Sequence, residues 1–288
     1  MVPKFFGQYL LEKEVLTRDQ LIEAINYQRS KVLKLGEIAL AKGYLTEKEI
    51  AKVHNEQRRT DKMFGELAVG MNLLTEARLK QILTIQQNNH IYLGEAIVAL
   101  GYLDQARLEK ELGAFKESQK VLPPVEVMIA EDIEHKDVMI AVVDITGKML
   151  RRVADLLSKT GQLRYEDKAI KNLGVASFIE LKGNLVSRII LNCTWDVAHH
   201  IARKTFKNES LPFDEELIID TTAEFTNIIC GNVRARLLEN GKVFEISPPN
   251  TLPDSKQTDI KLDKKEQAVI IPAYTPTGEL EVGLITKT

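Results

Sequence analysis

The feature that most constrains the fold is an internal repeat of 29 residues within the first 120 residues of the chain. A glycine recurs at this spacing, as Gly7, Gly36, Gly65 and Gly94. An apolar residue keeps the same step (Leu21, Ile50, Leu79, Leu108), and so does a glutamine (Gln28, Gln57, Gln86), with Phe115 in the fourth slot. Repeats of this length are supersecondary units that bury their apolar faces only by packing together. The sequence therefore predicts an all-α N-terminal domain of four helical hairpins over residues 1–118.

The second copy shows how each hairpin is built. Gly43 ends a short helix, and Thr46 precedes a longer one with Glu49 three residues later, which is the pattern of a capping box. The cap slot recurs through the repeat as Thr17, Thr46, Thr75 and Asp104. These residues predict where each long helix begins.

This pattern resembles the N-terminal domain of type II secretion and type IV pilus ATPases, of the MshEN type, in which an Arg-Leu-Gly…Gln repeat binds cyclic di-GMP. The Leu-Gly pairs correspond to Phe6-Gly7, Leu35-Gly36, Phe64-Gly65 and Leu93-Gly94. The arginine slot instead holds Phe5, Lys34, Met63 and Tyr92. None of these side chains can donate two parallel hydrogen bonds to guanine, as the planar guanidinium of arginine does. The resemblance therefore implies the fold, whereas cyclic di-GMP is not expected, and a structural or partner-docking role is favoured.

Residues 119–132 are predicted to link this domain to a second one, residues 133–288, because the stretch 113–126 loses periodicity and contains Pro123-Pro124. A helix is expected over 133–158, and Lys182-Gly183-Asn184 predicts the turn of a β-hairpin. The other expected elements are strands 173–181, 184–193, 243–246, 267–275 and 280–286, a helix over 194–206 capped by Thr194, a helix within 211–239, and a solvated loop over 254–266. This composition predicts an α+β domain with an antiparallel sheet and long helices.

The helix within 211–239 has an unusual polar face. At about 100° per residue, Asp220, Glu224, Asn227 and Gly231 fall within one narrow arc, opposite an ordinary apolar stripe. Glycine costs about 1 kcal/mol against alanine in a helix interior. Gly231, which has no side chain, lies beside a carboxylate and a carboxamide, and this combination indicates a surface on which another molecule docks. The alternative is an ordinary solvated helix face.

The spacing Asp-x3-Glu-x2-Asn, followed by Gly231-Asn232 and by Ile-Ser-Pro-Pro up to Pro248-Pro249, resembles the CheC/CheX/FliY phosphatases of bacterial chemotaxis, and the CheX branch fits best. The resemblance implies hydrolysis of the aspartyl phosphate on a CheY-like receiver domain. Asn227 would orient the attacking water, as a glutamine does in GTPases, and Glu224 would pair with a receiver lysine. Asp220 is expected to be structural or capping. The residues predicted to dock the partner are Asp220, Gly231, Asn232, Pro248 and Pro249.

The same resemblance implies a homodimer and no cofactor of the chain's own, with Mg²⁺ carried by the receiver. The alternative function is a non-catalytic signalling or scaffold module whose N-terminal repeats bind a partner protein or cyclic di-GMP. Intact Glu224 and Asn227 favour the phosphatase.

Composition excludes several other classes of function. A net charge of −2 gives no bulk attraction to nucleic acid or to membranes, and no apolar run reaches the length of a membrane span, so a cytoplasmic protein is expected. Cys193 and Cys230 are expected to be buried reduced thiols. His199 and His200 diverge by about 100° on a helix and cannot chelate a metal together.

Overall fold

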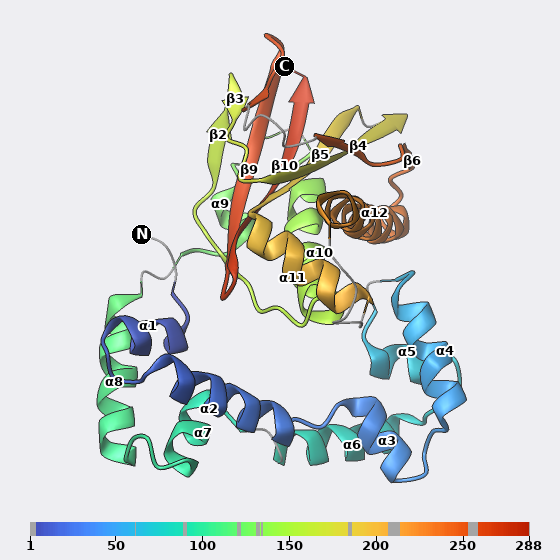
Figure 1. Ribbon diagram of the computed structural model, residues 1–288. Helices are drawn as coiled ribbons and strands as arrows, with labels where there is room; N and C mark the ends of the chain where they lie inside the picture. The colour runs from blue at the N-terminus through green and yellow to red at the C-terminus, as the bar shows by residue number, and fades with distance from the viewer. Residues whose placement is uncertain are drawn as a thin grey trace. The chain divides into compact units, whose positions relative to one another are not determined.

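The computed structural model describes residues 4–60, 62–88, 91–119, 122–130, 133, 135–183, 186–206, 214–252 and 259–287. Contacts divide the chain into two compact units, Lys4–Lys120 and Val121–Thr288. The regular elements described in the first unit are all helices, and the second combines a sheet with helices (Figure 1). The predicted fold class, an all-α domain followed by an α+β domain, is confirmed.

Each repeat of the first unit is a short helix followed by a longer one. The pairs are α1 (Phe6–Glu12) with α2 (Arg18–Lys31), α3 (Leu35–Ala41) with α4 (Glu47–Gln57), α5 (Phe64–Gly70) with α6 (Glu76–Asn88), and α7 (Leu93–Ala99) with α8 (Gln105–Ser118). The four predicted caps are confirmed, because Thr17, Thr46, Thr75 and Asp104 each accept a hydrogen bond from the backbone N–H three residues later. Helix α8 continues through Gly113 to Ser118, so the loss of periodicity at residue 113 does not mark the end of the helix.

The 29-residue glycine period has a packing cause. A Cβ on Gly7 would lie 3.0 Å from the side chain of Leu21, and one on Gly65 would lie 2.6 Å from that of Leu79. The same approach recurs between Gly94 and Leu108. The repeated glycine therefore lets the apolar residue that begins the long helix pack on the backbone of the short one.

The four repeats pack in two pairs rather than around one shared core. Repeats two and three form one apolar cluster, and repeats one and four form another. Two of the repeated glutamines support this pairing, because each one bonds a carbonyl just before the short helix of the repeat with which its own repeat packs. Gln28 Nε2 donates to the carbonyl of Ile91 at 3.0 Å, and Gln86 Nε2 donates to that of Leu33 at 3.1 Å. In the fourth slot Phe115 replaces glutamine and packs against the rings of Phe6 and Tyr9.

The second unit is built on an eight-stranded antiparallel sheet in which β1, β9, β10, β5, β4 and β6 are neighbours in that order, with β2 also paired to β9 and β7 to β4. Its strands are β1 (Lys159–Thr160), β2 (Arg164–Glu166), β4 (Val175–Gly183), β5 (Ser187–Cys193), β6 (Phe244–Ile246), β7 (Asn250–Leu252), β9 (Glu266–Thr275) and β10 (Gly278–Lys287). The predicted hairpin is confirmed, since β4 and β5 pair antiparallel from Val175↔Cys193 to Leu181↔Ser187. Part of its turn lies outside the described residues.

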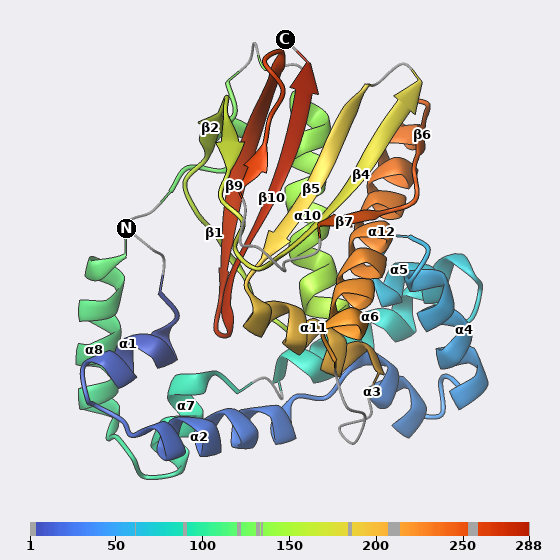
Figure 2. The same cartoon turned by 45° about the horizontal axis from the view of Figure 1, so that its top comes forward.

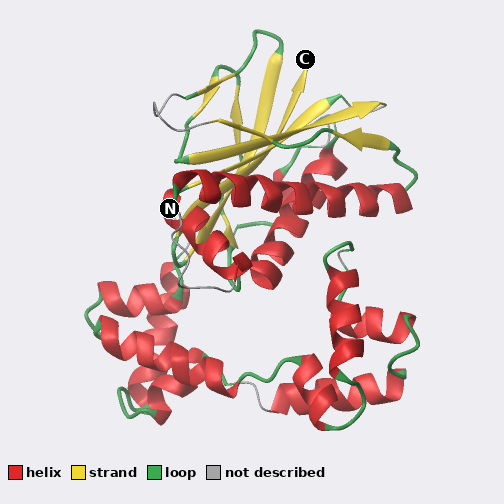
Figure 3. Cartoon of the chain, turned by 45° about the vertical axis from the view of Figure 1, so that its right-hand side comes forward, coloured by secondary structure: helices red, strands yellow, loops and turns green. Residues whose placement is uncertain are grey.

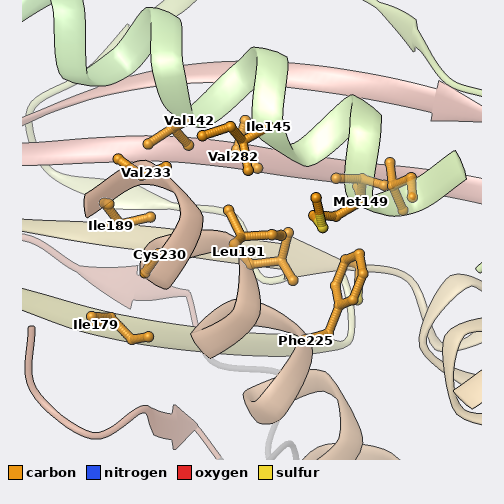
Figure 4. Close-up of a cluster of buried hydrophobic side chains, with 14 of the residues drawn as sticks. Val142, Ile145, Met149, Ile179, Ile189, Leu191, Phe225, Cys230, Val233 and Val282 are labelled. Atoms are coloured by element: carbon orange, nitrogen blue, oxygen red, sulfur yellow. The ribbon is translucent and has the colours of Figure 1, made fainter. Parts of the chain in front are cut away.

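Helices α10 (Lys136–Val153), α11 (Trp195–Phe206) and α12 (Glu215–Glu239) cover one face of this sheet (Figures 2 and 3). The short helix α9 (Val125–Met128) precedes them. The main core lies between the two layers, where α10 contributes Val142, Ile145 and Met149, and α12 contributes Phe225 and Val233 (Figure 4). The register of the sheet brings Ile179, Ile189, Leu191 and Val282 to the same side.

The opposite face of the sheet carries a second apolar cluster, which includes Ile170 of β3 (Ala169–Ile170) and Ile260 of β8 (Ile260–Lys261). Beside it lies a buried polar network. Arg164 Nη2 contacts Glu281 Oε1 at 2.6 Å, and Asn192 Nδ2 donates to Glu281 Oε2 at 3.1 Å. Burial raises the pKa of Glu281 more than the Arg164 guanidinium lowers it.

Three local predictions are wrong. Helix α10 ends at Val153, because Asp155 adopts a left-handed conformation (φ 50°) and the chain then enters β1. Thr194 does not cap α11, since its hydroxyl is buried against Gly278 without a hydrogen-bond partner. The segment 254–266 is not simply a solvated loop, because β8 lies within it and Ile260 is buried; residues 254–258 lie outside the described part.

Candidate functional site on helix α12

Helix α12 is buried around most of its circumference. Asp214 caps it, with the backbone N–H of Leu217 donating to Asp214 Oδ1 at 2.9 Å. Of the predicted apolar stripe, Ile219 is half-buried and the other members are buried (Ile218, Phe225, Ile229, Cys230, Val233 and Leu237). Thr222 and Thr226 are buried as well, and each hydroxyl donates to the carbonyl four residues earlier at 2.8 Å. Burial on these sides leaves one arc of the helix for contact with another molecule.

Glu224 and Asn227 lie on that arc and contact each other. Asn227 Nδ2 donates to Glu224 Oε2 at 3.4 Å, with Glu224 exposed and Asn227 half-buried. Within the described part of the chain, Asn227 Oδ1 accepts no hydrogen bond, so it is available to a water molecule. The carboxamide is therefore oriented from its nitrogen side and free on its oxygen side.

Gly231 and Asp220 share this arc. A Cβ on Gly231 would meet no atom within 4 Å, so the glycine leaves an open, flat position one turn beyond Asn227. Asp220 is exposed but lies well inside the helix, and the expectation that it caps the helix is wrong because Asp214 does so. Its side chain can contact a partner.

Asn232 does not lie on the exposed arc. It is 2% exposed, and its Nδ2 donates to the carbonyl of Ile228 at 2.7 Å. Five helical residues turn the side chain about 140° away from Asn227. The prediction that Asn232 docks a partner therefore fails in this structure.

Pro248 and Pro249 form a bulge in the edge strand beside α12. Leu181 pairs with Ile246 and Phe178 with Asn250, so three residues on the bulged side oppose two on β4. Proline has no backbone N–H to give to a ladder and is found at edges and bulges. Because β6 and β7 both contact α12, the bulge lies at the rim of the helix (Figure 2).

Residues 175–273 match the family model described as Chemotaxis phosphatase CheX. This segment runs from β4 into β9 and contains Glu224, Asn227 and the proline bulge. The C-terminal unit is CheX-like. The resemblance of the first unit to MshEN-type domains stays a prediction.

Solved structures of chemotaxis proteins are similar to the CheX-like unit. A candidate chemotaxis protein from Desulfovibrio vulgaris Hildenborough is 22% identical, covering 55% of this chain and 100% of its own, with a TM-score of 0.48. CheX from Desulfovibrio desulfuricans is 22% identical, over 51% of this chain and 97% of its own, with a TM-score of 0.47. The CheX–CheY–BeF3–Mg²⁺ complex from Borrelia burgdorferi is 27% identical, over 52% of this chain and 97% of the matched chain, with a TM-score of 0.41. A search of curated proteins gives no significant match.

Two surface hollows of the CheX-like unit lie elsewhere. One, of about 490 Å³, is lined by residues of α9, α10 and the segment 156–160. The other, of about 380 Å³, lies at the end of the sheet between β4, β5 and β10. Neither is lined by a residue of α12. The candidate site lies on an exposed helix face outside both hollows, and such a face suits a protein partner better than an enclosed small molecule.

The remaining candidate groups of the CheX-like unit are structural. Cys193 and Cys230 are buried and free, as predicted, and burial raises the pKa of the Cys193 thiol to about 12 and that of Cys230 further. His200 Nε2 lies 2.9 Å from the carbonyl oxygen of Ala154. Across the described residues, no group of three or more His, Cys, Asp and Glu side chains is placed to hold a metal ion. Likewise, no helix in the described part is long and apolar enough to cross a membrane.

The sequence interpretation missed three residues of the exposed arc, Glu216, Arg234 and Leu238. Arg234 is exposed and follows Asn227 by seven residues, which is two turns of the helix. Its spacing from Gly231 was the signal that could have found it.

Proposed function

We propose that the CheX-like unit hydrolyses the aspartyl phosphate of a CheY-like receiver domain. The observation that carries the proposal is the contact between Glu224 and Asn227, on the exposed face of an otherwise buried helix. That helix lies within the segment that matches the CheX family model. A CheY protein is what the Borrelia complex contains; for this chain, a receiver partner is part of the proposal.

In this mechanism, Asn227 places the attacking water. Its Nδ2 is held by the Glu224 carboxylate, and its Oδ1 accepts a hydrogen bond from the water that lies in line with the phosphorus. The water oxygen forms a bond to phosphorus as the bond between phosphorus and the receiver aspartate breaks. The aspartate leaves as a carboxylate, and the water proton passes to the phosphate, because a neutral amide cannot act as a base.

Glu224 has a second role in the proposal. Its exposed carboxylate pairs with a lysine of the receiver and holds the receiver in position on α12. The chain needs no cofactor of its own in this scheme, since Mg²⁺ is supplied by the receiver. We also propose a homodimer, which sedimentation of the full chain would measure.

The rate of phosphate loss from phosphorylated CheY-like receivers, with and without the full chain, tests the function. Asn227→Ala is expected to lower the rate roughly 10²-fold or more, because the water loses its positioning group. Asn240→Ala, at the C-terminal cap of the same helix, is the matched control and should retain the wild-type rate. A near wild-type rate for Asn227→Ala would refute the assignment.

A further inference from the structure

The exposed arc of α12 continues well beyond Glu224 and Asn227. Residues spaced three or four apart carry it along the whole helix, and they are Glu216, Asp220, Glu224, Asn227, Gly231, Arg234 and Leu238. Its charge changes sign along the helix, from three carboxylates through the amide and the glycine to a guanidinium. The last member, Leu238, is an apolar side chain that is 55% exposed.

Apart from Glu216, the carboxylates on this stripe do not stabilise the helix that carries them. Glu216 and Asp220, and Asp220 and Glu224, are like charges at i,i+4, a spacing that destabilises a helix. Of the three carboxylates on the stripe, only that of Glu216 lies in the first turn, where a negative charge interacts favourably with the helix dipole. The acidic half of the stripe is therefore better explained by a cationic partner than by the helix itself.

Arg234 has no carboxylate to pair with at its helical neighbours. Cys230, Gly231, Leu237 and Leu238 occupy the positions three and four residues away. Within the described residues the structure gives Arg234 no ion pair, whereas Arg236, two residues later, contacts Asp144 Oδ2 at 2.7 Å. An exposed, unpaired arginine beside an open glycine and an exposed leucine forms the second half of a charge-complementary docking surface.

We propose that Arg234 sets the register of docking: the receiver places a carboxylate side chain against Arg234 while its lysine meets Glu224. This inference rests on the proposed function and adds a specificity-determining residue to it. At 1.5 Å of rise per residue, Glu224 and Arg234 are about 15 Å apart along the helix. The receiver must therefore carry the two opposite charges at about that separation, on the face beside its phosphoryl group.

Steady-state dephosphorylation of a CheY-like receiver, phosphorylated with acetyl phosphate, tests the register. Arg234→Glu is expected to raise KM by about five- to tenfold and leave kcat within about twofold, because docking weakens while Asn227 still places the water. Arg234→Lys should keep most of the affinity. Arg203→Glu on α11, another exposed arginine away from the stripe, is the matched control and should leave KM unchanged.

Two further measurements separate register from a general charge effect. The wild-type KM should rise with salt more steeply than that of Arg234→Gln. Reversing one receiver carboxylate, about 15 Å from its docking lysine, should restore KM for Arg234→Glu. If no such reversal restores it, the register proposal is wrong.

Binding of the phosphorylated receiver, measured by calorimetry, distinguishes the inference from the proposed function. If the wild type is active and Arg234→Glu binds the receiver with unchanged affinity, the register proposal is wrong and the proposed phosphatase function is retained. An inactive wild type whose binding is lost on Arg234→Glu overturns the phosphatase and supports the docking surface. A wild type that neither binds nor acts overturns both.

Discussion

At the scale of single residues, the site depends on which positions around α12 are left without packing. Gly231 shows this most directly, since it lies in the helix interior and a Cβ there would meet nothing within 4 Å. We expect Gly231→Ala to raise the free energy of unfolding by about 0.5–1 kcal/mol, because alanine is the better helix former. The same variant should bind the receiver more weakly, since the added methyl group would occupy part of the proposed docking surface. Thermal unfolding and receiver affinity measure the two effects. A more stable variant with undiminished affinity would show that the partner does not approach this position.

At the scale of elements, the central strand β10 shows the opposite use of glycine. A Cβ on Gly283 would lie 2.3 Å from Ile270 Cδ1 and 3.0 Å from the carbonyl oxygen of Val269, so the neighbouring strand fills its place. We expect Gly283→Ala to lower the free energy of unfolding by about 1–3 kcal/mol through overpacking. Gly231→Ala, in the same unit, serves as the control of opposite sign. Denaturant unfolding monitored by circular dichroism measures both, and unchanged stability of Gly283→Ala would contradict the close packing.

At the scale of the whole molecule, binding of cyclic di-GMP by the first unit is the alternative to a structural or partner-docking role. The four residues in the arginine slot precede the short helices, and two of them, Met63 and Tyr92, are 62% and 66% exposed without any charge to offer a phosphate. The glutamine amides of Gln28 and Gln86 already donate to backbone carbonyls. We expect calorimetry of the full chain against cyclic di-GMP to give no saturable binding at micromolar concentrations. Saturable binding there would instead make the repeats a nucleotide sensor.

What the sequence determined by itself is mostly local. The period of 29 residues specified the helical hairpins and their caps, because a cap depends on residues only three apart. The spacing of Glu224 and Asn227 likewise placed both side chains on one helix face, and apolar runs around Lys182-Gly183 specified the β4–β5 hairpin.

The tertiary structure decided what depends on contacts between distant segments. Such contacts pair repeat one with repeat four and bury Asn232. They also bury the Thr194 hydroxyl, so that it does not cap α11, and they place Pro248-Pro249 in a bulge. Strands of two or three residues, such as β1 and β7, are too short to show a period and exist only because a longer strand offers its edge. A helix pattern says which residues share a face, but whether that face meets solvent or another layer is settled by where the layer packs. The Glu224–Asn227 pair is exposed as a candidate site because the sheet, α10 and α11 cover the other sides of α12.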